Sequence, residues 1–230
     1  MTAVLPIPEL AIIVPMRNEI GVLPELLDHL ARWQACGCEV LIVDGGSTDG
    51  SVEAVQAAGL PLIRAAPGRA GQMNAGAKAT DAGIMLFLHA DTRLPTEADR
   101  QIIAALMDGQ VWGRFDVRIA GRPRMLRMVA TMINLRSRWT GIATGDQAMF
   151  VRRGSFAALG GFAQLPLMED IDLSRRLGAL SRPACLRAKV QTSGRRWESR
   201  GVWRTILLMW RLRLAYWLGV SPERLAEAYR

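Results

Sequence analysis

Residues 84–92 read IMLFLHADT: five apolar residues, then a histidine, an alanine, an aspartate and a threonine. The apolar run is too short for a helix and is bounded by Gly83 and Pro95, which predicts a buried strand of a parallel sheet. Such a strand delivers His89 and Asp91 to the carboxyl edge of the sheet, where open α/β folds hold their ligands. A carboxylate at that edge suits a hard divalent cation, although an isolated aspartate can equally cap the next helix.

The preceding segments repeat a strand and helix pattern. Residues 10–15 (LAIIVP) form a short apolar run that ends in a polar turn, and residues 22–33 carry apolar side chains at helical spacing. Residues 40–43 are a second apolar run that leads into the glycine-rich loop 44–50, and residues 51–58 follow as a helix. This alternation predicts a parallel βαβ arrangement.

Further elements are expected after the glycine-rich loop. Residues 61–64 predict a third strand, followed by a glycine-punctuated helix start at residues 67–76. Residues 97–107 predict a helix, and residues 141–151 predict a strand. Polar and apolar residues alternate in 114–119 (RFDVRI), which predicts a half-exposed strand antiparallel to the parallel set.

Composition limits the classes of partner. The chain has 230 residues, 50% of them hydrophobic, which predicts one main core with a helical appendage. The net charge of +8 comes almost wholly from arginine, which suits bidentate contacts to phosphate or carboxylate, and no nucleic-acid motif accompanies it. The three cysteines include no CxxC pair, and no signal-peptide pattern opens the chain, so we expect a cytoplasmic location.

The last half of the chain contains two basic, amphipathic segments. Residues 123–138 carry methionines and arginines at helical spacing, and these arginines are interpreted as a solvated face. Tryptophans then recur at intervals of seven, at Trp203, Trp210 and Trp217. This stripe leaves three interpretations open: packing on the same protein, contact with a homodimer partner, or peripheral contact with anionic lipid on the inner face of a membrane.

Six segments taken in order resemble family 2 glycosyltransferases of GT-A fold, most closely a small bacterial branch. They are IIVPMRNE (12–19), LIVDGGSTDG (41–50), GRAGQMNAG (68–76), LFLHADT (86–92), GDQAMFVRR (145–153) and LPLMEDIDLSRRL (165–177). Each motif alone is weak, but their order and spacing together are specific. The resemblance implies a GT-A (Rossmann-like) α/β fold: a mixed, mainly parallel sheet flanked by helices. It implies a catalytic domain over residues 1–198 and a C-terminal helical appendage over 199–230.

The resemblance assigns donor-binding roles residue by residue. It implies that the nucleotide sugar is bound by Pro15, Arg17, Glu19, Asp44, Arg69, Asn74, His89 and Arg196. It further implies that Asp91 binds a divalent metal, Mn or Mg, as the last aspartate of a D-x-D motif. The first aspartate of that motif is His89 in this chain. His89 is therefore open to three interpretations: a metal ligand, a hydrogen-bond partner of ribose or phosphate, or a structural residue.

The resemblance also assigns the catalytic and acceptor sides. Asp170 corresponds to the base that deprotonates the acceptor hydroxyl, with Glu169 in support, and Asp146, Gln147 and Trp197 lie on the acceptor side. The implied function is an inverting, metal-assisted glycosyltransferase that uses a UDP- or GDP-sugar and an acceptor that is lipid-linked or amphiphilic. Two alternatives are a nucleotidyltransferase and a non-catalytic membrane-surface protein that keeps the fold.

Overall fold

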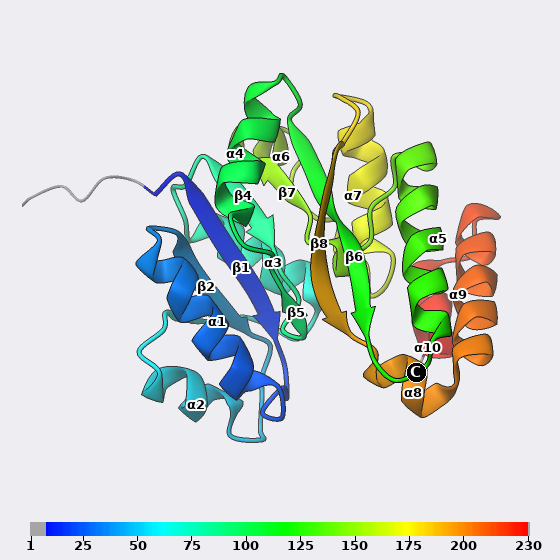
Figure 1. Ribbon diagram of the computed structural model, residues 1–230, viewed down its shortest axis with the longest axis horizontal. Helices are drawn as coiled ribbons and strands as arrows, with labels where there is room; N and C mark the ends of the chain where they lie inside the picture. The colour runs from blue at the N-terminus through cyan, green and yellow to red at the C-terminus, as the bar shows by residue number, and fades with distance from the viewer. Residues whose placement is uncertain (1–7, 230) are drawn as a thin grey trace, which may run out of the picture.

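An eight-stranded sheet of order β3-β2-β1-β4-β7-β6-β8-β5 runs through the computed structural model of the protein, which describes residues 8–229 (Figure 1). The strands are β1 (Leu10–Met16), β2 (Glu39–Asp44), β3 (Leu62–Arg64), β4 (Ile84–Phe87), β5 (Thr92–Arg93), β6 (Trp112–Ala120), β7 (Phe150–Arg152) and β8 (Ala184–Ser193). Strands β1 to β4 are mutually parallel, whereas β7 is antiparallel to both of its neighbours. The prediction of a mixed, mainly parallel sheet is confirmed.

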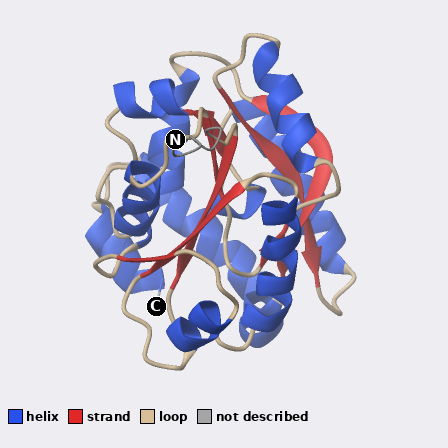
Figure 2. Ribbon diagram, turned by 90° about the vertical axis from the view of Figure 1, so that its left-hand side faces the viewer, coloured by secondary structure: helices blue, strands red, loops and turns tan. Residues whose placement is uncertain are grey.

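Helices cover both faces of the sheet (Figure 2). They are α1 (Leu23–Ala35), α2 (Ser51–Ala57), α3 (Arg69–Lys78), α4 (Ala98–Met107), α5 (Met125–Thr140), α6 (Arg153–Ala158), α7 (Glu169–Gly178), α8 (Arg195–Arg200), α9 (Val202–Trp217) and α10 (Pro222–Tyr229). Neighbouring residues of a strand point to opposite faces, so Ile12 and Ile13 of β1 belong to two separate buried clusters. Helices α1, α4 and α5 close one cluster, and α3, α6 and α7 close the other.

Two expectations about the second half of the sheet were wrong. Strand β6 is antiparallel only to β7, which is itself antiparallel to β4, so β6 runs in the same direction as the parallel set. It is also buried through most of its length rather than half-exposed. Within residues 141–151, the strand begins only at Phe150, and Gly145–Gln147 form a short 3₁₀ turn, η1.

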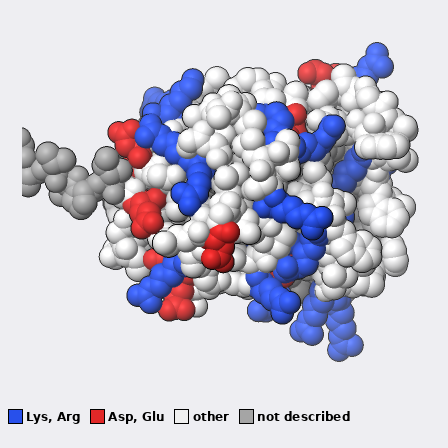
Figure 3. Space-filling view, turned by 90° about the horizontal axis from the view of Figure 1, so that it is seen from above, with Lys and Arg blue, Asp and Glu red and all other residues white. Residues whose placement is uncertain are grey.

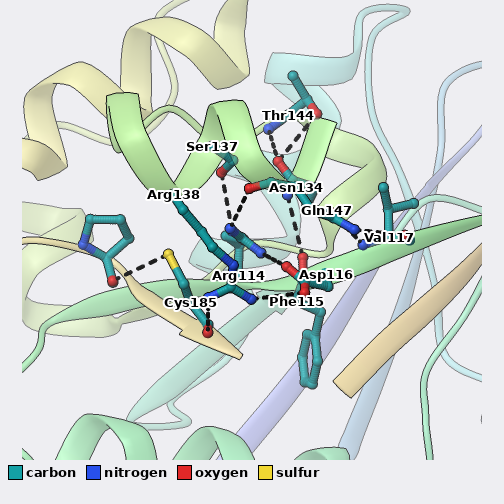
Figure 4. Close-up of polar contacts among 11 residues, drawn as sticks. Arg114, Phe115, Asp116, Val117, Asn134, Ser137, Arg138, Thr144, Gln147 and Cys185 are labelled. Carbon is teal, nitrogen blue, oxygen red and sulfur yellow. Dashed lines mark hydrogen bonds and ion pairs between the residues drawn. The ribbon is translucent and has the colours of Figure 1, made fainter. Parts of the chain in front are cut away.

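A buried polar network explains the misleading alternation in β6 (Figure 4). Arg114 is fully buried and pairs with Asp116, which also pairs with Arg138 of α5 at 2.8 Å. Asn134 of α5 bonds both backbone groups of Val117, accepting at 2.8 Å and donating at 3.1 Å. Arg114 and Asp116 of β6 therefore face a covering helix instead of water, and they fix α5 on the sheet.

The C-terminal helices pack against the start of α7. Leu212 of α9 and Leu225 of α10 form a small buried cluster with Met168 and Ile171. The outer face of α9 stays exposed, with its tryptophans between 63% and 81% accessible.

Among the described residues, none of the helices is long and apolar enough to cross a membrane. Lys and Arg side chains are spread widely over the face seen in Figure 3, and acidic ones are fewer.

Candidate functional site

One hollow lies at the carboxyl edge of the parallel strands. Asp44 ends β2 and is only 3% exposed, and its carboxylate accepts the N–H groups of Gly46 at 3.0 Å and Ser47 at 3.1 Å. Arg64 at the end of β3 is in register with Asp44. Together these residues line a hollow of about 240 Å³. Hydrogen bonds from the turn hold the Asp44 carboxylate at this edge, where it can meet a bound ligand.

The glycine-punctuated helix α3 braces that edge. Gln72 is buried, and its Nε2 donates to the carbonyls of Met16 at 2.8 Å and Val43 at 2.7 Å, which joins the ends of β1 and β2. A Cβ on Gly45 would lie 2.8 Å from the Gln72 side chain, so any larger residue there would displace the Gln72 amide from these two bonds. Asn74, predicted to bind the donor, instead uses its amide to exchange two hydrogen bonds with the backbone of Phe162.

An ion pair joins α3 to α7 across the site. Nη1 of Arg69 lies 3.2 Å from Oε1 of Glu169, whose side chain is only 3% exposed. Burial and the neighbouring Asp170 raise the pKa of Glu169, and the Arg69 guanidinium only partly offsets this. The pair places a cation beside two adjacent carboxylates that come from the first turn of α7.

Asp170 is held by two backbone donors. Its Oδ2 accepts the N–H of Gly145 at 2.8 Å, and its Oδ1 accepts the N–H of Ile171 at 2.7 Å. The N-terminus of α7 adds a favourable dipole for the negative charge. Each carboxylate oxygen keeps a free lone pair, so Asp170 can still accept a proton from a ligand.

His89, which follows strand β4, lies against the turn η1. Nδ1 of His89 lies 3.5 Å from Oδ1 of Asp146, and a Cβ on Gly145 would lie 2.3 Å from Nε2 of His89. Although burial opposes ionisation, His89 holds the pKa of Asp146 below its usual value. Both ring nitrogens of His89 thus face η1, which favours the structural interpretation of this residue over metal ligation.

Asp91 is the residue predicted to hold a divalent metal. It is half-buried in the turn between β4 and β5, and its Oδ1 accepts the Thr92 hydroxyl at 3.4 Å. Residues 8–229 contain no group of three or more His, Cys, Asp or Glu side chains arranged to hold a metal ion. An ion of the magnesium type is commonly held by one or two carboxylates together with the phosphate oxygens of a substrate.

A larger cavity of about 580 Å³ opens beside the carboxylates, between α5, α7 and α9. The predicted site residues that line it are Arg69, His89, Asp146, Glu169, Asp170 and Trp197. Gln147 was predicted on the acceptor side, but it is fully buried in a capping box with Thr144 and does not line the cavity.

The other predicted donor residues lie outside this cavity. Pro15 is half-buried in β1, and Arg17 is exposed in the turn that follows. Glu19 pairs with Arg195 at 3.3 Å, and burial raises its pKa. Arg196 is exposed and stacks over the Tyr229 ring at 4.2 Å.

The sequence did not single out two arginines that line the cavity, Arg136 of α5 and Arg213 of α9. Residues 123–138 were interpreted as carrying a solvated arginine face, but Nε and Nη2 of Arg136 are buried. Nothing in the local sequence separates Arg136 from its neighbours, because the cavity that it lines also takes residues from α7 and α9.

Comparisons with known proteins identify the family and the fold of this chain. A family model described as glycosyl transferase family 2 matches residues 11–160. No curated protein matches the chain. The fold is similar to that of S. aureus TarS 1–349, with a TM-score of 0.64 and 19% identity over 81% of this chain and 60% of that one. TarS 1–349 has also been solved in complex with UDP-GlcNAc.

A second solved structure shares the fold. It is the mannosyltransferase PcManGT from Pyrobaculum calidifontis, in complex with GDP-Man and Mn²⁺. The TM-score is 0.63 and the identity 23%, over 91% of this chain and 61% of that one. The chain therefore spans about three-fifths of the length of the structures it matches. At identities this low, the two matches show that the fold is shared.

Proposed function

This chain belongs to glycosyl transferase family 2, and we propose that it moves a sugar from a nucleoside-diphosphate sugar to an acceptor hydroxyl, with inversion at the sugar carbon. One observation carries the proposal. The Asp170 carboxylate is held by the Gly145 and Ile171 amides at the margin of a large cavity, beside the Arg69 cation. A general base, a charge for the leaving group and room for an acceptor therefore meet at one point.

The proposed reaction is a single displacement. The acceptor oxygen bonds to the sugar carbon as the bond from that carbon to the diphosphate oxygen breaks, and the electron pair leaves with the nucleoside diphosphate. The acceptor proton passes to Asp170. Glu169 stays paired with Arg69, and this pairing keeps the Arg69 guanidinium directed at the site where charge develops on the leaving group.

The donor is proposed to lie along the carboxyl edge of β1 and β2. Asp44 and the adjoining hollow would bind the nucleoside, with Pro15 near the end of β1 and Arg17 and Glu19 in the segment that follows. Arg69 and Arg196 would face the diphosphate. The complexes of similar folds with UDP-GlcNAc and with GDP-Man support a UDP- or GDP-sugar as donor.

Asp91 is proposed to hold a divalent ion, Mn or Mg, together with the diphosphate. Such an ion, when bound, neutralises negative charge that develops on the leaving group. Asp91 supplies one hard oxygen ligand at the carboxyl edge of the sheet, near the proposed path of the diphosphate.

The acceptor is proposed to be lipid-linked or amphiphilic, and the outer face of α9 to contact anionic lipid. Neither α5 nor α9 contains an acidic residue, and both expose tryptophan, Trp139 on the first and Trp217 on the second. Flotation with phosphatidylglycerol vesicles tests this contact. We expect the wild type to float and Trp217→Glu to lose at least half of that binding. A homodimer through the same face would instead appear as a doubled mass without lipid.

Donor binding is tested by thermal unfolding with UDP or GDP, with and without Mn²⁺. A ligand at a hundred times its dissociation constant adds about 2.7 kcal/mol, or roughly 5 to 10 °C for a chain of this size. We expect a manganese-dependent rise that Asp91→Ala abolishes and that Asp108→Ala, an exposed control, retains. A rise of equal size in Asp91→Ala would contradict the metal role.

Transfer itself is tested by release of the nucleoside diphosphate. Asp170→Asn is expected to lower the rate by about 10²- to 10⁴-fold while nucleotide binding persists. Asp172→Asn is the matched control, because this residue lies in the same helical turn but pairs with Arg176. Equal losses in the two variants would contradict the base assignment.

A further inference from the structure

The cavity beside Asp170 combines two kinds of surface. Carboxylates form part of the wall, while methionine, isoleucine, leucine and tryptophan side chains, mostly from α5 and α9, form most of the rest. Several of these wall residues are also more than half exposed, among them Met128, Met132, Trp203 and Trp210. The cavity is therefore continuous with the exposed apolar surface of the two helices, and it can receive a long apolar group from outside.

Two guanidinium groups lie within this largely apolar cavity. Arg136 projects from α5 and Arg213 from α9. Nε and Nη2 of Arg136 are buried and have no hydrogen-bond partner among the described residues. Burial first, and then the charge of Arg213, lower the pKa of Arg136 to about 10. The two cations are thus close enough to repel each other in a poorly solvated place.

The protein itself does not compensate this arrangement. Asp170 and Asp146 attract both cations, yet among the described residues neither carboxylate forms an ion pair with Arg136 or Arg213. Buried donors without partners are rare in folded proteins, and each one calls for a reason. A bound anion supplies that reason, because guanidinium groups bind phosphate and carboxylate in bidentate fashion.

We infer that Arg136 and Arg213 form a subsite for an acidic group on an amphiphilic ligand, whose apolar body lies between α5 and α9. The acidic group is a phosphate or a carboxylate. Identifying this ligand as the acceptor rests on the proposed function, whereas the ligand class rests on the cavity alone. Glu169 and Asp170 line the same cavity and disfavour a second anion there.

The test measures binding of decyl phosphate, neutral decyl glucoside and inorganic phosphate by calorimetry, with the amphiphiles below their micelle concentrations. We expect decyl phosphate to bind at least tenfold more tightly than decyl glucoside, and inorganic phosphate to bind more weakly than decyl phosphate. Arg136→Gln and Arg213→Gln should each weaken decyl phosphate about tenfold and leave decyl glucoside unchanged. Arg211→Gln is the matched control, an exposed arginine of α9 that does not line the cavity.

Two results would overturn the inference: equal affinity for the charged and neutral amphiphiles, or an equal loss in Arg211→Gln. A second arm measures binding to phosphatidylglycerol vesicles and identifies the source of the ligand. Loss of both free decyl phosphate and vesicle binding in Arg136→Gln and Arg213→Gln supports a membrane-held ligand. Loss of decyl phosphate binding alone supports a ligand dispersed in solution. Loss of neither kind of binding refutes the subsite.

These outcomes are separable from those of the proposed function. A protein that binds nucleotide with Mn²⁺ but does not distinguish the amphiphiles would refute the subsite alone. If the protein selects decyl phosphate through Arg136 but binds no nucleotide, the subsite is supported and the proposed glycosyl transfer is refuted.

Discussion

Replacing Arg136 with methionine is expected to stabilise the free protein. The substitution removes a guanidinium whose Nε and Nη2 are buried without partners, and it leaves an unbranched apolar side chain among Met132 and the other wall residues. Most substitutions of buried residues destabilise a protein, so a gain would identify Arg136 as a residue retained for binding rather than for folding.

The expected gain in stability equals the free-energy cost of burying the Arg136 guanidinium, which can be estimated in two ways. A buried donor without a partner costs about 1–3 kcal/mol. A pKa lowered from its usual 12.5 to about 10 corresponds to roughly 3 kcal/mol against the charged form at neutral pH. Below pH 10 Arg136 is charged in both the folded and the unfolded chain, so the folded protein bears the whole free-energy cost of that charge. We therefore expect a gain of about 1–3 kcal/mol, which raises Tm by roughly 2 to 12 °C.

The assay is thermal unfolding at pH 7, with and without decyl phosphate. Arg211→Met is the control, and it should change stability by no more than about 0.5 kcal/mol because its side chain is exposed. Decyl phosphate should raise the Tm of the wild type more than that of Arg136→Met, because the variant binds it about tenfold more weakly, so the difference in stability narrows when ligand is present. A clear fall in the Tm of ligand-free Arg136→Met would refute the reasoning.

Three further outcomes are expected. Gly145→Ala places a Cβ 2.3 Å from Nε2 of His89, and the resulting shift of η1 should lower the transfer rate about 100-fold; a rate within twofold of the wild type would contradict this. Burial, and then the charges of Arg93 and Arg32, lower the pKa of His29 to about 4. Stability should therefore fall by up to about 3 kcal/mol as pH drops from 6.5 towards 4, and this fall should be smaller in His29→Gln. Burial raises the pKa of Glu169 above the usual 4.5 of a glutamate. The free energy of unfolding should therefore decline as the pH rises above 4.5, and Glu169→Gln should show a shallower decline in Tm between pH 5 and 8.

The parallel half of the fold could be predicted from the chain because its signals are local. Each apolar run ends in a glycine, a proline or a polar turn, and parallel strands bring their carboxyl ends to one edge. Asp44 and Asp91 were placed at that edge from these rules, and the structure has them there.

The second half of the sheet was less predictable for a physical reason. Alternating polarity in β6 is typical of a strand with one wet face, but Arg114 and Asp116 satisfy each other under α5. A polarity pattern does not distinguish water from a buried polar network. Strand β8 was not predicted at all, because its charged residues interrupt the apolar signal that marked β1 and β4.

The two halves of the proposed site thus differ in what determines them. The donor edge is set by sheet topology, so residues close to strand ends already identify it. The acceptor cavity forms where α5, the start of α7 and α9 meet, and its arginines, Arg136 and Arg213, are 77 positions apart in the chain. A change confined to α9 could therefore alter which acceptor is bound while Asp44, Asp91 and the sheet edge stay intact. This separation predicts that acceptor preference follows α9, whereas nucleotide preference follows β1 and β2.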